Sequence, residues 1–171
     1  NDRENQEVID YLNKENDYYH TVTASTKDFQ TALFEEMKGR IKEDDESVPY
    51  LYNGYYYITR FEKGQDYPIY SRKKGSLDAA EEIMFNCNEM AKGHKYFQLG
   101  GVSISNDNQL AIFCTDVIGR RIYSLQIKNL LTGEILSDKV EQTTGNAVWA
   151  NDNKTIFYTK QDEKTLRSDK V

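Results

Sequence analysis

Cysteine and histidine are scarce in this chain of 171 residues, with two of each, and both scarcities exclude kinds of site. Cys87 and Cys114 lie far apart and form no Cys-x-x-Cys pair, which argues against a disulfide framework and a structural zinc site. We interpret them as buried or incidental thiols. A reducing compartment is therefore compatible with the sequence.

Long apolar segments are missing as well. The longest apolar run, Leu110 to Cys114, falls far short of the roughly 20 residues that a membrane-spanning helix needs. No signal-type segment with a basic flank and an apolar centre begins at Asn1. We expect a soluble protein without a membrane partner. A cytoplasmic location is the simplest expectation, and a periplasmic one stays open.

Concentrated positive charge is absent too. The formal net charge is -6 at pH 7, and the 22 Lys and Arg residues are scattered along the chain. A stripe of basic residues that could follow a phosphate backbone is not present. We expect no nucleic-acid partner.

Signatures of catalysis and of cofactor binding are also lacking. The stretch nearest to a Gly-x-Ser-x-Gly elbow, Gly101 to Ser105, ends in serine and lies among predicted strands. His20 and His94 have no recognisable nucleophile context and are interpreted as surface or core residues. Gly100, Gly101 and Gly119 match no phosphate-loop pattern. We predict no catalytic, cofactor-binding or metal-binding residue and no cofactor for this chain.

Three polar clusters have structural interpretations. The acidic run Glu43 to Glu46 lacks the ligand spacing and central glycine of a calcium loop, so we interpret it as a solvated helix end. Asp107 and Asp152 look like hairpin residues rather than ligands. Arg120 and Arg121 could meet a carboxylate, but an exposed pair at the start of a strand explains them equally well.

Apolar spacing predicts helices in the first part of the chain. Between residues 4 and 45, apolar residues recur every three to four positions, as on one face of a helix. Pro49 fits poorly with any continuation of the helix. We predict an N-terminal helical arm over residues 1–47. The two apolar faces consist of Val8, Ile9, Tyr11 and Leu12, and of Phe29, Leu33, Phe34, Met37 and Ile41.

Residues 48–171 have the pattern of an antiparallel β region without helices. Aromatic and β-branched runs, which favour strands, recur about every ten residues between turn formers, and Asn53-Gly54 is a strong hairpin signal. The predicted strands are Tyr55 to Phe61, Tyr67 to Arg72, Glu82 to Phe85, Gly101 to Ile104, Leu110 to Thr115, Arg121 to Lys128, Glu134 to Leu136, Ala147 to Trp149 and Thr155 to Thr159.

A repeat indicates which kind of β fold this is. Asn106, Asp107 and Asn108 recur 45 residues later as Asn151, Asp152 and Asn153, each time before an apolar run. About four strands per 45 residues is the size of one propeller blade, although two similar hairpins can also arise independently. We predict blades at about 49–91 and 101–139 and the beginning of a third at 146–171. Because propellers close with roughly four to eight blades, we expect the chain to be a piece of a longer protein.

Three segments together resemble a known family. Residues 15–77, 101–136 and 147–171, with "VPYLYNGYYY" and "GRRIYSLQIKNLLTGE" among them, are similar to the N-terminal part of oligopeptidase B (protease II), in the prolyl oligopeptidase family of serine peptidases. Gln6 stands where relatives usually carry proline, which affects only the cap of the first helix.

The resemblance implies a fold and a function. The family has a helical arm, a seven-bladed propeller and a C-terminal α/β-hydrolase domain that carries the catalytic Ser, Asp and His, none of which can be placed on this chain. It implies an endopeptidase that cleaves short basic peptides after Arg or Lys, with the propeller restricting access. The partners would be the hydrolase domain of the same protein and these peptides. The alternative is a noncatalytic propeller-like binding module that closes by oligomerisation.

Overall fold

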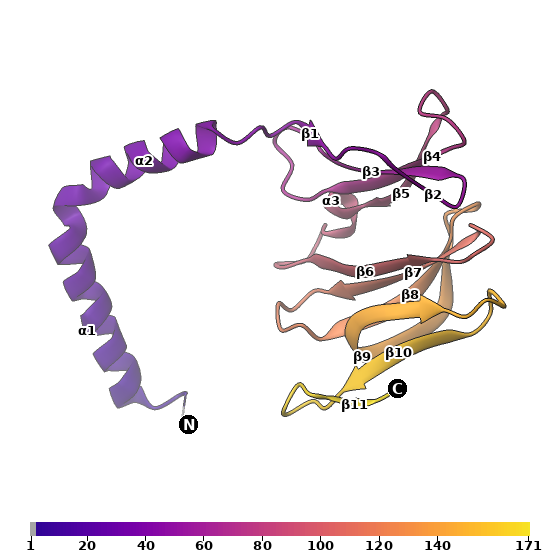
Figure 1. Cartoon of the computed structure of the whole chain (residues 1–171). Helices are drawn as coiled ribbons and strands as arrows, with labels where there is room; N and C mark the ends of the chain where they lie inside the picture. The colour runs from indigo at the N-terminus through magenta and orange to yellow at the C-terminus, as the bar shows by residue number, and fades with distance from the viewer. Residues whose placement is uncertain (1–2) are drawn as a thin grey trace. The chain divides into compact units, whose positions relative to one another are not determined.

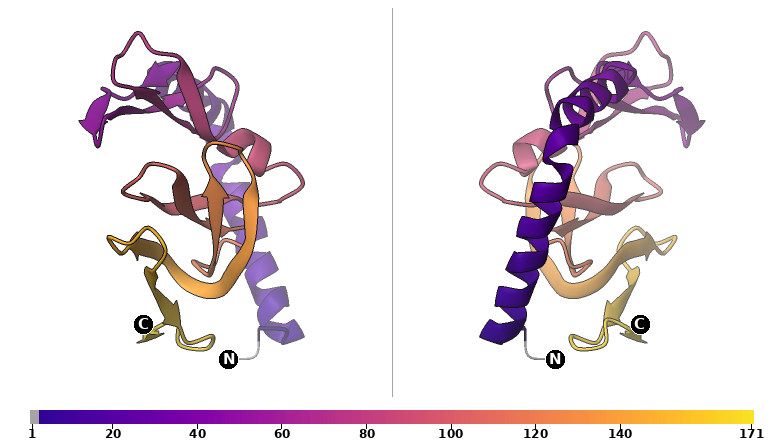
Figure 2. Two further views of the ribbon diagram at one scale, coloured as in Figure 1. Left: turned by 90° about the vertical axis from the view of Figure 1, so that its right-hand side faces the viewer. Right: turned by 90° about the vertical axis from the view of Figure 1, so that its left-hand side faces the viewer.

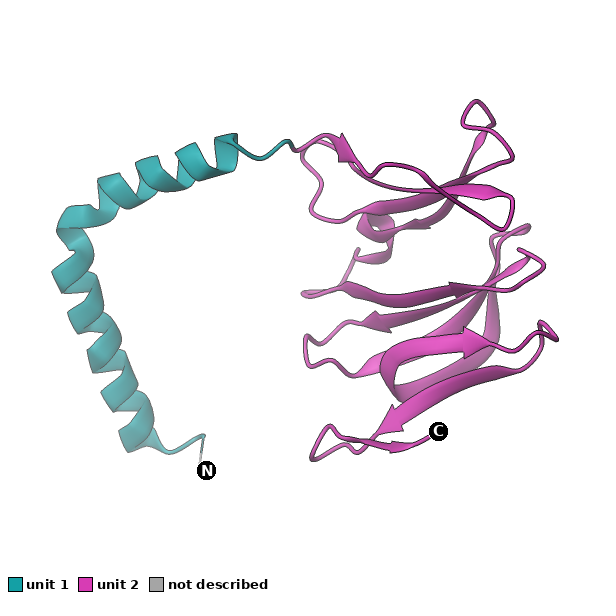
Figure 3. Cartoon of the chain, viewed as in Figure 1, with its two compact units in different colours: residues 1–42 teal, residues 43–171 magenta. Residues whose placement is uncertain are grey.

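The computed structural model describes residues 3–171 and divides the chain into two compact units, residues 1–42 and 43–171 (Figure 3). The first two residues of the predicted arm lie outside the described part. The division falls earlier than residue 47 because Asp45 and Glu46 already pair with a strand of the second unit.

The first unit is helical, as predicted. Helices α1 (Gln6–Thr23) and α2 (Lys27–Gly39) are joined by a short 3₁₀ helix, Ala24–Thr26. Asn5 caps α1 because its side-chain oxygen accepts the main-chain N–H of Glu7 at 3.0 Å. No residue of these three helices is buried. Among the described helices, none is long and apolar enough to cross a bilayer.

The second unit begins with a five-stranded antiparallel sheet, which we call the first blade (Figure 1). Both β1 and β2 pair with β3, so together they form the edge of the sheet beside β3. The strands are β1 (Asp45–Glu46), β2 (Tyr50–Tyr52), β3 (Tyr55–Phe61), β4 (Ile69–Lys74) and β5 (Glu81–Asn86).

Two predictions fail in this blade. The acidic run Glu43 to Glu46 is not a helix end, because α2 stops at Gly39 and the last two acidic residues form β1. The β region also contains a helix, α3 (Cys87–Met90), whose first turn is capped by the Asn86 side chain. Asparagine at such a cap competes with strand continuation because its oxygen satisfies helix N–H groups.

The other strands form a six-stranded antiparallel sheet in chain order. Strands β6, β7, β8 and the first part of β9 make the second blade, and the rest of β9 with β10 and β11 makes the beginning of a third. Their bounds are β6 (Gln98–Ile104), β7 (Leu110–Asp116), β8 (Tyr123–Asn129), β9 (Ile135–Trp149), β10 (Ile156–Gln161) and β11 (Ser168–Lys170).

Strand β9 merges two strands that the sequence pattern separates. The predicted strands Glu134 to Leu136 and Ala147 to Trp149 are two ends of one 15-residue strand. It bends where Gln142 and Gly145 take positive φ angles of 62° and 88° and the register shifts. Figure 2 shows its curved path. The bend carries β9 from β8, with which its first part pairs, to β6, where the Trp149 indole N–H donates to the Ser103 carbonyl at 3.0 Å.

The core consists of the faces between successive blades. Strand β7 is buried on both sides: Phe113 packs in a cluster with Phe85 of the first blade, with ring centroids 5.1 Å apart, whereas Ile112 and Cys114 pack toward β9 and β10. Successive side chains of a strand point to opposite faces, so one strand joins both interfaces. Together with the order of the strands, this face-to-face stacking confirms the predicted propeller architecture, which residues 3–171 do not close.

Arg72 connects the first two blades through a buried guanidinium. Its side chain is fully buried, its Nε donates to Glu82 at 2.8 Å, and its Nη1 donates to the Asn108 carbonyl of the second blade at 3.1 Å. The guanidinium carbon lies 4.0 Å from the centroid of the Tyr55 ring. These partners offset the large cost of burying a charge.

Turns from the three blades also contact one another, and we call Asn53, Asn106, Asn108, Asn151 and Asn153 the asparagine row. Asn53 Nδ2 donates to the Asn106 carbonyl at 2.8 Å, and Asn108 Nδ2 donates back to the Asn53 carbonyl at 3.2 Å. Asn106 Nδ2 donates to Asn151 Oδ1 at 3.4 Å, and the Asp107 N–H donates to Asn153 Oδ1 at 3.3 Å. The repeated turn thus joins neighbouring blades.

The carboxylates of the two aspartates in the repeat make local hydrogen bonds, as predicted. Asp107 accepts from the Ser105 hydroxyl and the Gln109 N–H. Asp152 accepts from both the N–H and the hydroxyl of Thr155, and these hydrogen bonds lower the pKa of its carboxyl to about 2.

Replacing Gly101 with alanine should destabilise the second unit. The new Cβ would lie 2.7 Å from the Gly145 carbonyl oxygen, so β6 and β9 would have to separate. We expect Gly101→Ala to cost about 1–3 kcal/mol of unfolding free energy, measured by urea unfolding with Trp149 fluorescence. Gly39→Ala is the control, because its Cβ meets nothing within 4 Å. Equal stability of Gly101→Ala and the parent chain would contradict the close approach.

Both cysteines should be unreactive in the folded chain. Cys87 and Cys114 are unpaired, have at most 1% exposure, and burial raises the pKa of each thiol to about 11. At pH 8 about one thiol in a thousand is ionised, and the thiolate is the reactive form. We expect no colour with Ellman's reagent under native conditions and two equivalents in denaturant. Rapid native labelling would show that the blade interfaces open readily.

Candidate functional site: a tyrosine pocket between the first two blades

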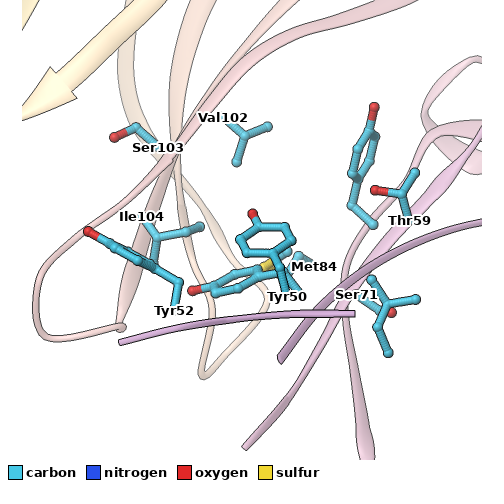
Figure 4. Close-up of a pocket in the computed structure, with 11 residues that line it drawn as sticks. Tyr50, Tyr52, Thr59, Ser71, Met84, Val102, Ser103 and Ile104 are labelled. Carbon is cyan, nitrogen blue, oxygen red and sulfur yellow. The ribbon is translucent and has the colours of Figure 1, made fainter. Parts of the chain in front are cut away.

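A pocket of about 350 Å³ lies between the first blade and β6 of the second, and we call it the tyrosine pocket (Figure 4). Side chains from both blades surround it. They are Tyr50, Tyr52, Tyr57, Ile58, Thr59, Tyr70, Ser71, Met84, Val102, Ser103 and Ile104.

The Asn53-Gly54 hairpin places the first tyrosines of this pocket. Because the loop has two residues, Tyr50 pairs with Tyr57 across β2 and β3. Their rings stack with centroids 5.3 Å apart. Tyr57 is only 5% exposed, whereas Tyr50 and Tyr52 keep 62% and 60% of their surface exposed. The pocket therefore has a buried aromatic floor and two accessible rings.

The hydroxyl of Tyr57 is buried beneath the pocket floor. The Tyr57 hydroxyl has no hydrogen-bond partner within residues 3–171. Burial raises the pKa of the phenol, and the nearby Arg72 guanidinium offsets only part of this shift. The phenol therefore stays protonated at neutral pH.

The lining suits binding rather than catalysis. It contains no histidine, cysteine, carboxylate or lysine, so general acid–base chemistry at neutral pH and metal ligation lack the usual groups. Apolar walls with a few hydroxyls are typical of ligand pockets. Exposed tyrosine rings can bind aromatic or aliphatic groups, and they attract cations through the ring face.

A second, smaller pocket of about 250 Å³ lies farther out between the same blades. Lys128 from β8 lines it and donates from Nζ to the Met84 carbonyl at 2.6 Å, with Nζ 5.2 Å from the centroid of the Phe85 ring. Burial lowers the pKa of this ammonium. Lys128 is thus a further polar link between the blades.

The residues singled out from the sequence do not assemble into a site. His20 is exposed on α1, where its ring meets the edge of Tyr19, and His94 is exposed in the turn after α3. In the described part of the chain, no three His, Cys, Asp or Glu residues are placed to hold a metal ion. Ser103 lies in β6 and lines the pocket, with Gly100 and Gly101 beside β9.

Arg120 and Arg121 also differ from the sequence interpretation. Both are exposed, but they lie in a turn before β8, which begins at Tyr123. The buried Asp116 carboxylate organises this turn and accepts the Arg121 main-chain N–H at 2.7 Å.

Sequence reasoning missed the tyrosine pocket, although one signal was available. The predicted strands begin at Tyr55, whereas Tyr50 and Tyr52 lie in β2. The two-residue loop at Asn53-Gly54 fixes the register on both sides, so the pairs Tyr50–Tyr57 and Tyr52–Tyr55 follow from the hairpin. The contribution of β6 could not be found in this way.

Comparison with known proteins supports the architecture. A family model described as "Prolyl oligopeptidase, N-terminal beta-propeller domain" matches residues 1–171. Dipeptidyl aminopeptidase BI of Pseudoxanthomonas mexicana is 39% identical, covering 99% of this chain and 25% of that protein. Protease 2 of Moraxella lacunata is 33% identical, covering 95% of this chain and 24% of that protein.

A solved structure agrees with these relatives. Oligopeptidase B from Leishmania major superposes with a TM-score of 0.83 and 33% identity, covering 98% of this chain and 24% of that one. The chain thus spans about a quarter of the length of the proteins that it matches. From the family match over residues 1–171 and the stacked blades, we conclude that the chain belongs to the prolyl oligopeptidase family as an N-terminal β-propeller domain.

Proposed function

We propose that the chain is the N-terminal part of a serine endopeptidase that cleaves short peptides after arginine or lysine. The observation that carries the proposal is the similarity of nearly the whole chain to Protease 2 and to oligopeptidase B from Leishmania major. In this proposal the catalytic serine, aspartate and histidine belong to a C-terminal α/β-hydrolase domain, since the 171 residues contain no Gly-x-Ser-x-Gly elbow.

Exposed apolar side chains on the helices of the first unit are evidence for a partner domain. Phe29, Phe34 and Met37 on α2 are each more than 60% exposed, although amphipathic helices normally bury such a stripe. Exposed apolar patches mark interaction surfaces. We infer that the hydrolase domain of the same protein covers these side chains.

The packing of the second unit is consistent with a role in selecting which substrates reach the active site. In this proposal its tightly packed blades form a wall that folded proteins cannot pass, while an extended peptide can follow the inner strands. The net charge of -6 attracts basic peptides over a distance. The Tyr50 and Tyr52 rings offer faces on which an arginine or lysine side chain can bind.

A cytoplasmic location is part of the proposal. Cys87 and Cys114 are both unpaired, and unpaired thiols are typical of reducing compartments.

The chain alone should be inactive, whereas the product of the complete reading frame should be active. We expect no release of chromophore from an Arg-containing chromogenic dipeptide by residues 1–171, and ready release by the longer protein. The codons after Val171 should lead to a Gly-x-Ser-x-Gly motif. Cleavage by the chain itself would overturn the proposal. A frame without a hydrolase domain, together with a defined closed oligomer in sedimentation, would favour the noncatalytic binding module.

A dipeptidyl aminopeptidase activity is a second candidate function, because a relative with 39% identity is a dipeptidyl aminopeptidase. An enzyme of that kind removes dipeptides from a free amino terminus. We expect the complete protein to cleave an Arg-containing substrate whose amino terminus is blocked, to cleave short basic peptides internally, and to leave a folded protein intact. Cleavage of the unblocked substrate alone, with dipeptides as products, would assign the aminopeptidase activity instead.

A further inference from the structure

Asn53 differs from the other residues of the asparagine row in its contacts and in the residue that follows it. It makes two contacts with the second blade, one through Nδ2 and one through its carbonyl oxygen. It is also followed by Gly54, and the sequence contains no other Asn-Gly dipeptide. Asn53 is therefore one of the residues that link the first two blades, and within the asparagine row it has the least hindered successor.

Deamidation of this dipeptide needs only water and a base from the solvent. The main-chain nitrogen of Gly54, after losing its proton to base, can attack Cγ of the Asn53 side chain. A bond forms between this nitrogen and Cγ, the bond from Cγ to Nδ2 breaks, and Nδ2 leaves as ammonia. Water then opens the five-membered imide at either carbonyl, so the products are aspartate or isoaspartate. No oxidation or reduction takes place.

The structure leaves the attacking nitrogen accessible. Asn53 and Gly54 are both exposed, and a Cβ placed on Gly54 would meet nothing within 4 Å. The last pair of the hairpin ladder is Tyr52 with Tyr55, so Gly54 lies outside the ladder. Asn53 has a φ of 45°, in a region that side-chain-bearing residues rarely occupy. The contact from Asn53 Nδ2 to the Asn106 carbonyl restrains the amide until this turn opens.

We propose that Asn53-Gly54 is a deamidation site, and that its conversion breaks the hydrogen bond that the Asn53 amide donates to the turn of the second blade. The product carboxylate cannot donate, and it would face the Asn106 carbonyl oxygen, which lies 2.8 Å from Nδ2 in the unmodified chain. Two acceptors at that distance repel each other. Isoaspartate also lengthens the main chain within a two-residue loop, which disturbs the hairpin that positions Tyr50 and Tyr52.

The other asparagines of the row should deamidate more slowly, and the loss of the amide should affect their contacts differently. Asn106 and Asn151 precede aspartate, and Asn108 and Asn153 precede glutamine and lysine, so a side chain hinders attack at each. Asn151 contributes Oδ1, which accepts from Asn106 Nδ2. An aspartate at position 151 would keep this acceptor. The same change of amide to carboxylate is therefore harmful at position 53 and harmless at position 151.

The first experiment follows the unmodified chain in mildly alkaline buffer at 37 °C. Tryptic peptides are examined by mass spectrometry for the replacement of NH₂ by OH, and isoaspartate is detected by enzymatic carboxyl methylation. We expect conversion at Asn53 with both products, while the other four members of the row remain asparagine. If Asn53 stays intact in the folded chain but converts in urea, the turn protects it and the proposal fails.

The second experiment tests the consequence. Asn53→Asp should lower the melting temperature by about 2–4 °C, the shift expected for one net hydrogen bond in a protein of this size. Asn151→Asp is the matched control and should melt with the parent chain. Equal melting of both variants and the parent would show that conversion does not weaken the contact between blades. Should Asn53→Asp not fold, partly converted parent chain serves instead, since its converted fraction should melt first.

Discussion

The packing of the first two blades depends on one buried charge. Arg72 has no exposed surface, yet it meets Glu82 on its own blade, the Tyr55 ring beneath it and the Asn108 carbonyl on the next blade. A buried guanidinium is tolerated only where such partners replace water. Nη1 reaches across to the second blade, whereas the buried Nη2 has no hydrogen-bond partner within residues 3–171. A shift of one blade against the other would break the Asn108 contact as well and raise the cost of the buried charge, so Arg72 favours one register of the two blades.

The second and third blades are joined in another way. There the main chains of β6 and β9 approach so closely that a Cβ on Gly101 would meet the Gly145 carbonyl oxygen at 2.7 Å, and β9 itself belongs to both blades. The first junction joins separate sheets through an apolar cluster and polar side chains, whereas the second also has a strand that is continuous between the blades. The tyrosine pocket lies at the first junction, and the asparagine row spans both.

Much of the β region could be predicted because its signals are local. The strand Tyr55 to Phe61 was placed correctly from its aromatic run, and Asn53-Gly54 marked its hairpin. The helix α3 was missed because its four residues follow a strand without a break in apolar pattern, and only the Asn86 cap distinguishes it. The acidic residues of β1 were assigned to a helix because their pairing partners, Arg60 and Phe61, lie far along the chain.

By itself, the sequence determined the type of most elements, the period of 45 residues and hence the blade, because hydrophobic spacing and turn formers act between near neighbours. The tertiary structure alone decided that β9 is one bent strand, that Arg72 is buried and that four tyrosines surround a pocket. Each of these depends on contacts between residues far apart in sequence, such as Arg72 with Asn108 and Trp149 with Ser103. Such contacts form only when the blades stack, and no local pattern records which side chains will meet.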